Sequence, residues 1–214
     1  GYDYYVLVTH LNSSMHPSWN KAHSSLAMLE NRDCDCDFVF WIDADAVIMN
    51  MSFPVHSVVI ASRAAGRTKT DLWVSADTLV VNAAMTLWRL GNATADGDHG
   101  FTRRLLLEML GMHPVKLWET GALATILLGC QPSDSEARKR QCYAAADRGW
   151  TDSAFAWRLK AAEAGALSEL GHGPNDNATA GLGINATLRA RIEWIPKRTW
   201  NSYPKGKVWG QYRW

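Results

Sequence analysis

The chain has 214 residues, of which 47% are hydrophobic and 20% charged, so it can bury one substantial core. Its formal net charge of +1 argues against nucleic-acid binding and against a polybasic membrane-binding surface. No apolar run is long enough to span a bilayer, and no signal peptide is visible. The sequence shows neither internal repeats nor a second domain, so we expect residues 1–214 to belong to a single α/β domain.

The first predicted elements are a strand over residues 4–9 and a helix over residues 19–30. Helical spacing places Ala22, Leu26 and Leu29 on the inner face of this helix. Ser18 stands where an N-cap residue is expected.

The next predicted strand, residues 38–42, is a continuous apolar run typical of a buried strand in a parallel sheet. It leads directly into Asp43 and Asp45, whose spacing points both side chains the same way at the carboxyl end of the strand, where open α/β sheets bind ligands. Paired carboxylates in this place indicate a hard divalent cation that also contacts phosphate oxygens. The D-x-D pattern alone is weak, because it occurs four times in the chain. The alternative is a strand-ending turn with solvated aspartates.

Further elements follow from apolar runs and helical periodicity. They are a short element at 47–49, an apolar run at 57–61, a strand over 77–82 feeding a helix to about Leu90, helices over 101–110, 118–128 and 154–170, and loops over 91–100 and 172–183.

Sequons and cysteines bear on the compartment. Asn-x-Ser/Thr sequons begin at five asparagines: Asn12, Asn50, Asn92, Asn177 and Asn185. Chance would give roughly one, so they favour a lumenal chain. Cys130 and Cys142 bracket a polar loop and form either a disulfide or two free buried thiols, whereas Cys34 and Cys36 are too close for an easy bridge and lack the spacing of a zinc site.

Several segments resemble the galactosyl-, mannosyl- and xylosyltransferase family of Golgi enzymes, glycosyltransferase family 34. Residues 16–21 match its W-x-K segment, and residues 41–50 (W-I-D-A-D-A-V-I-M-N) match its strand ending in D-x-D. Residues 195–204 look like its N-S-Y-P signature, and residues 1–6 look like its G-Y-D-Y-Y-V strand. The resemblance is thin between residues 85 and 190.

The resemblance implies a GT-A type fold, a Rossmann-like and mostly parallel sheet flanked by helices. It also implies that both ends are clipped. The family's first nucleotide-binding strand and membrane anchor would precede residue 1, and a segment with a metal-binding histidine would follow Trp214. The chain would then be part of a catalytic domain from the Golgi lumen, with its membrane anchor outside this sequence.

The activity implied is metal-dependent transfer of galactose, xylose or mannose from a UDP- or GDP-sugar to a glycan or polysaccharide, with retention of configuration. Mn²⁺ held by Asp43 and Asp45 would bridge the two phosphates of the donor. Lys21 is the candidate phosphate or nucleotide contact, or else a solvated helix lysine. Lys205 is a weaker phosphate candidate, and His16 is either an orienting residue or a simple loop histidine.

The chain departs from the family in two places. Where relatives carry an acidic or E-x-D/Q segment at the start of a helix, this sequence has Glu119, Thr120 and Gly121. Glu119 is therefore the candidate catalytic carboxylate, the alternative being a helix-terminal glutamate favoured by the macrodipole. The family's asparagine and glycine are also absent from residues 74–78.

These departures keep two other classes of function open. One is a catalytically weak or inactive homologue that serves as a subunit of a Golgi complex. The other is a carbohydrate-binding module, suggested by the 11 tryptophans, most of which we expect in the core.

Overall fold

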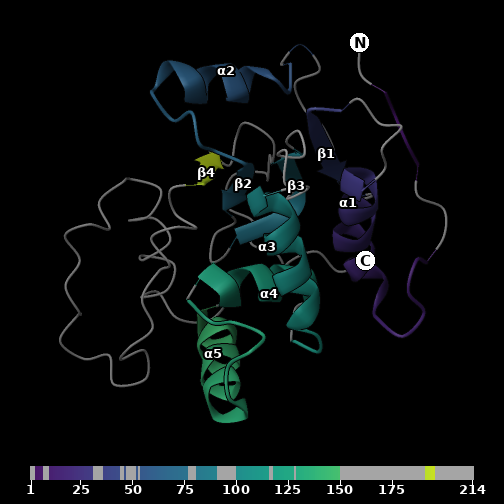
Figure 1. Cartoon of the computed structure of the whole chain (residues 1–214), viewed down its shortest axis with the longest axis vertical. Coiled ribbons are helices and arrows are strands. Elements are labelled where there is room, and N and C mark those ends of the chain that lie inside the picture. Colours follow the sequence, from purple (N-terminus) through teal and green to yellow (C-terminus); the bar gives the residue numbers. More distant parts are fainter. Residues whose placement is uncertain are drawn as a thin grey trace, which may run out of the picture.

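The computed structural model describes residues 3–6, 10–30, 36–43, 46, 52, 54–76, 81–90, 100–115, 118–127, 129–149 and 191–195. In chain order the elements are the 3₁₀ turn η1 (Pro17–Trp19), α1 (Asn20–Glu30), β1 (Phe38–Ile42), α2 (Ser57–Ala64), β2 (Leu72–Ala76), β3 (Val81–Arg89), α3 (Gly100–Gly111), α4 (Trp118–Leu127), α5 (Glu136–Gly149) and β4 (Ile192–Ile195). The fold is a mixed α/β structure, as predicted, with helices around one four-stranded sheet (Figure 1).

The strand order is β1-β3-β2-β4, with β3 antiparallel to both neighbours and β4 parallel to β2. The prediction of a mostly parallel sheet is therefore wrong for the described strands, because two of their three pairings are antiparallel. β1, β2 and β4 nevertheless run in one direction, so their carboxyl ends share one edge of the sheet. β1 is half-buried along its length and not fully buried as predicted.

Each face of the sheet carries its own apolar cluster. On one face Leu72, Val74 and Trp88 pack with α1, α3 and α4. On the other face Trp73 and Met85 pack with α2. In Figure 1, α2 accordingly lies at one end of the view and α4 and α5 at the other, with the strands between them.

β3 is the main departure from the predicted elements. Residues 83–90 were expected in a helix, because alanine, methionine and leucine favour helices. They instead form the central strand, whose backbone pairs with β1 on one side and β2 on the other. Two ladders of backbone hydrogen bonds outweigh a propensity of a few tenths of a kcal/mol per residue.

Other predictions fare unevenly. The predicted helices at 19–30, 101–110 and 118–128 are confirmed as α1, α3 and α4, and the strand at 38–42 as β1. Residues 4–6 form no strand and are exposed. The apolar run at 57–61, whose type the sequence left open, lies in α2; α5 and β4 were not anticipated.

The predicted N-cap is also wrong, because Ser18 lies inside η1 and His16 caps that turn by accepting a hydrogen bond from the Ser18 amide. The predictions for residues 7–9, 47–49, 77–80, 91–99, 154–170 and 172–183 lie outside the described residues.

The Cys130–Cys142 disulfide is confirmed. Cys36 is also disulfide-bonded, and Cys34, with which its close spacing was considered, lies outside the described residues.

Candidate functional site

Three of the residues singled out in the sequence meet at the carboxyl edge of the sheet. Asp43 directly follows β1, and its amide donates to the Ala84 carbonyl at 2.8 Å, which holds it as a continuation of the ladder. Lys21 lies in the first turn of α1, and Glu119 lies in the first turn of α4. Because α1 and α4 cover the same face of the sheet, their first turns bring both side chains to Asp43.

The Lys21 ammonium is the centre of this cluster. Its Nζ lies 3.0 Å from Asp43 Oδ1 and 3.1 Å from Asp43 Oδ2, and 2.8 Å from Glu119 Oε1. It also donates to the Ala83 carbonyl at 2.9 Å. An ammonium has three donors, and here three groups accept from it. The predicted direct contact between Lys21 and a phosphate therefore requires one of these partners to be released.

The Ala83 carbonyl reaches Lys21 because β3 is irregular at this point. The register between β2 and β3 shifts between Val74 and Ser75, so that Val74 pairs with Thr86 but Ser75 pairs with Asn82. Three residues of β3 lie between these two pairs, and the carbonyl of one of them, Ala83, accepts from Lys21. Bulges of this kind are common beside functional sites, where they re-aim groups.

Asp43 is the open end of the cluster. Its side chain is 30% exposed, whereas those of Lys21 and Glu119 are 7% and 6% exposed. Oδ1 also accepts from Trp41 Nε1 at 2.5 Å, while Oδ2 accepts from Lys21 alone among the described residues. Because this side chain is partly exposed and ends in hard carboxylate oxygens, it fits a divalent cation such as Mn²⁺. The second predicted ligand, Asp45, lies outside the described residues.

Glu119 is buried more deeply than a solvated helix-terminal residue. Oε1 accepts from Lys21 and from the Thr120 hydroxyl at 3.2 Å, while Oε2 is buried and has no hydrogen-bond partner within the described part of the chain. Gly121, where the family carries an acidic or amide residue, is buried in α4. An aspartate at position 121 would therefore add a second buried charge.

His16 and Trp118 form a stacked aromatic pair beside these helix starts, with ring centroids 4.0 Å apart and an interplanar angle of 10°. The His16 ring is held by the Ser18 hydroxyl at 3.0 Å. The contacts of His16 thus match those of a loop histidine that braces a neighbour. Lys205 lies outside the described residues.

Sequence reasoning missed two partners of this cluster. Trp41 stands two residues before Asp43 on the same strand, so period-two alternation could have found it. The Ala83 carbonyl carries no sequence signal, because it depends on the irregular pairing of β3.

A second ionic cluster lies at the opposite end of β2. Asp71 precedes the strand and pairs with Arg191, and Arg89 Nη1 lies 3.7 Å from Asp71 Oδ1. Burial raises the pKa of Asp71 above its usual value, and the arginines only partly offset this effect. These contacts tie Arg191, directly before β4, to Asp71 before β2 and to Arg89 at the end of β3, which is a structural role.

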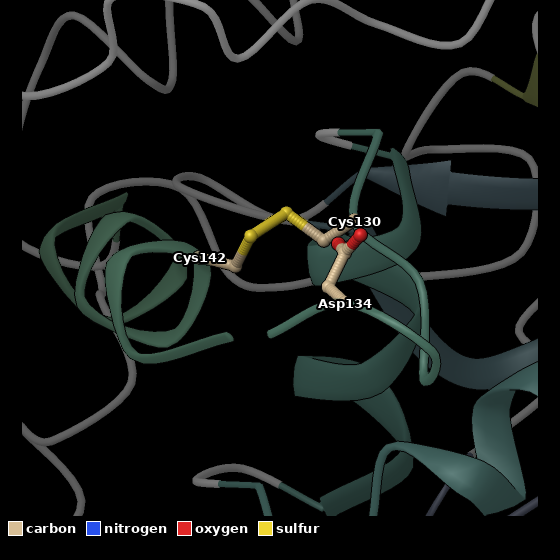
Figure 2. Close-up of side chains that lie close together, drawn as sticks. All are labelled: Cys130, Asp134 and Cys142. Atoms are coloured by element: carbon tan, nitrogen blue, oxygen red, sulfur yellow. A yellow bond between two sulfur atoms is a disulfide. The ribbon is translucent and has the colours of Figure 1, made fainter. Parts of the chain in front are cut away.

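Cys130, Asp134 and Cys142 also lie close together, with ligand atoms within 4.8 Å of one another (Figure 2). The two sulfurs are bonded to each other, so they lack the thiolates that bind metals. This group is a disulfide beside an aspartate and not a metal centre.

Comparison with known proteins adds no relative: no family model, no curated protein and no solved structure matches the chain. The fold and site together define a mixed α/β structure with a carboxylate–lysine–carboxylate cluster, open only at Asp43, at the carboxyl ends of its codirectional strands. Among the described helices, none is both long and apolar enough to cross a membrane.

Proposed function

We propose that the chain is the catalytic part of a retaining, Mn²⁺-dependent glycosyltransferase that moves galactose, xylose or mannose from a UDP- or GDP-sugar to a glycan or polysaccharide. One observation carries the proposal. Asp43, Lys21 and Glu119, each singled out by a different segment of the sequence, converge through contacts of 2.8–3.1 Å. They do so at the strand edge where α/β sheets bind ligands.

In this proposal each residue of the cluster has its own task. Asp43 offers a partly exposed carboxylate to the cation, and Asp45 would supply a second carboxylate. Mn²⁺ bound there would stabilise the charge on the departing nucleoside diphosphate. Lys21 fixes the orientation of Asp43 through contacts with both of its oxygens. Glu119 places a carboxylate behind the site, where its charge favours the positive character that develops on the sugar during transfer.

The proposed setting is the Golgi lumen, with the chain held to the membrane by an anchor outside this sequence and assembled in a homo- or hetero-oligomeric complex. The five sequons and the Cys130–Cys142 disulfide support an oxidising, glycosylating compartment.

The test is nucleotide binding measured by calorimetry. UDP or GDP should bind only when Mn²⁺ is present, and Asp43→Ala and Asp45→Ala should each abolish this binding. Asp43→Ala should leave the fold intact, because Asp43 follows β1 and is partly exposed. Glu30→Ala, which removes a half-exposed carboxylate at the end of α1 away from Lys21, is the matched control and should leave binding unchanged. Equal affinity in the wild type and both site variants would overturn the proposal.

The second candidate is an inactive homologue that acts as a subunit of a transferase complex. It is favoured by two observations. Glu119 is buried and paired with Lys21, and the buried residue at position 121 is a glycine where the resemblance led us to expect an acidic or amide side chain. Slow hydrolysis of a nucleotide sugar, assayed with and without Mn²⁺, separates the two. An enzyme releases sugar from one donor, whereas an inactive subunit binds the nucleotide without turnover. A carbohydrate-binding module would bind glycan and ignore the nucleotide.

A further inference from the structure

The Lys21 side chain is a positive charge that the protein has buried between two negative ones. Its side chain is 7% exposed, and it is held by α1, the end of β1, the irregular part of β3 and α4 at once. Burying an ammonium is costly unless its donors are satisfied, and here the three acceptor groups satisfy them. Such a lysine is fixed in place and cannot swing out toward a ligand without leaving Glu119 and the Ala83 carbonyl unpaired.

The summed charge of this cluster sets its relative affinity for a divalent cation and for a diphosphate. Asp43 and Glu119 carry two negative charges and Lys21 one positive charge, so the three groups sum to −1. A divalent cation at the exposed Asp43 carboxylate would bring this sum to +1. Asp45, the second ligand in the proposed function, would lower each sum by one, so the lysine charge is what keeps the cation-loaded site from becoming negative and repelling a diphosphate. With the lysine charge removed, the sum would be −2 before the cation binds and 0 afterwards.

We propose that Lys21 makes cation binding at Asp43 depend on the nucleotide diphosphate. The buried ammonium weakens the binding of the cation alone and strengthens the binding of the anionic nucleotide to the cation-loaded site. The inference rests on the proposed function and assigns to Lys21 a role other than direct phosphate contact. It follows from the fixed position of the ammonium, within 3.1 Å of both Asp43 oxygens and away from the exposed side.

The physical consequence is a pair of opposite effects. Even at the dielectric constant of water, a unit charge about 6 Å from a divalent ion changes its affinity roughly tenfold. Removing the lysine charge should therefore tighten the binding of the cation and loosen the binding of the nucleotide.

The experiment is a charge cycle on two residues. Mn²⁺ affinity without nucleotide is measured from the electron paramagnetic resonance signal of the free ion, and UDP and GDP affinity at saturating Mn²⁺ by calorimetry. Lys21→Met should tighten Mn²⁺ binding by roughly tenfold and weaken nucleotide binding by a similar factor. Glu119→Gln should change both affinities in the reverse directions. The double variant Lys21→Met/Glu119→Gln, whose charge sum is again −1, should lie within about threefold of the wild type in both.

The double variant also guards against misfolding. Lys21→Met alone leaves the Glu119 carboxylate buried without a counter-charge, which is strongly destabilising. Glu119→Gln and the double variant leave no buried carboxylate unpaired. If Lys21→Met does not fold, these two proteins and the wild type still carry the test.

Other results would overturn the inference. Weaker nucleotide binding with unchanged Mn²⁺ affinity in Lys21→Met would mean that Lys21 contacts phosphate directly. Weaker binding of both ligands would mean that it only shapes the site. If Mn²⁺ affinity depends on Asp43 but ignores the charge cycle, this inference alone fails. If Asp43→Ala binds Mn²⁺ as tightly as the wild type does, the proposed function and this inference both fail.

Discussion

At the scale of single residues, the unusual positions gather where α1 and α4 begin. Lys21 and Glu119 are charged and buried, and Trp118, next to Glu119, is a bulky residue with a left-handed φ of 53°. The left-handed conformation costs an L-residue roughly 1–2 kcal/mol. The Trp118 ring is stacked on His16, so the contacts that hold this residue include an aromatic pair.

Trp118 gives a direct test of this backbone strain. Trp118→Ala and Trp118→Gly both lose the stack on His16, but only glycine adopts the left-handed conformation freely. The glycine variant should therefore be more stable than the alanine variant by about 1 kcal/mol, measured by urea unfolding.

Leu107, exposed in the middle of α3, is the matched control for Trp118. There the order should be reversed, with Leu107→Gly less stable than Leu107→Ala by about 1 kcal/mol. The same order at both positions would show that Trp118 has no left-handed constraint in solution.

At the scale of elements, helical periodicity and apolar runs predicted those helices and strands that depend mainly on their own sequence. The periodicity of residues 19–30 and 101–110 and the apolar run at 38–42 were sufficient for α1, α3 and β1. The segment at 81–89 was mispredicted in part because its sequence suits a helix while its neighbours in space, β1 and β2, require a strand.

The same division holds for the site. Asp43, Lys21 and Glu119 could be named from motifs, and the structure brings them together. What motifs could not supply is the partner set of Lys21. The Ala83 carbonyl depends on a register shift between β2 and β3, and the burial of Glu119 depends on how α4 packs against β3.

The end of α3 carries a packing prediction. A Cβ added at Gly111 would lie 3.0 Å from both Cβ and Cγ of Pro132. Pro132 cannot easily yield, since the turn around it is closed by a 2.8 Å hydrogen bond from the Gln131 amide to Asp134 Oδ2. Gly111→Ala should therefore lower the free energy of unfolding by about 1–2 kcal/mol, although alanine normally favours a helix.

Removing the obstacle is the control for Gly111. In a Pro132→Gly background the same Gly111→Ala change should be neutral or stabilising, because the crowding atoms are gone and the helix preference of alanine remains. An equal loss of stability in both backgrounds, measured from denaturant midpoints, would contradict contact with Pro132 as the cause.

At the scale of the whole molecule, α5 is held in place by few buried side chains. Among the side chains described in it, Cys142 alone is buried, and the Tyr143 hydroxyl donates to the Met112 carbonyl at 3.2 Å. The disulfide from Cys142 to Cys130, just beyond α4, therefore holds a largely polar helix that has little apolar surface to keep it in place (Figure 2).

Replacing both cysteines tests how much the molecule depends on this link. The two residues are 12 apart in sequence, and closing a loop of this size stabilises a protein by about 3 kcal/mol. Cys130→Ala/Cys142→Ala should lose about this amount, which corresponds to a fall of roughly 6–12 °C in Tm. Because α5 has few other anchors, hydrogen exchange should accelerate first in residues 136–149 and much less in β2 and β3. A reductant should lower the Tm of the wild type more than that of the variant, since Cys36 is disulfide-bonded in both. Unchanged exchange in α5 would mean that Tyr143 and the neighbouring backbone hold this helix without the disulfide.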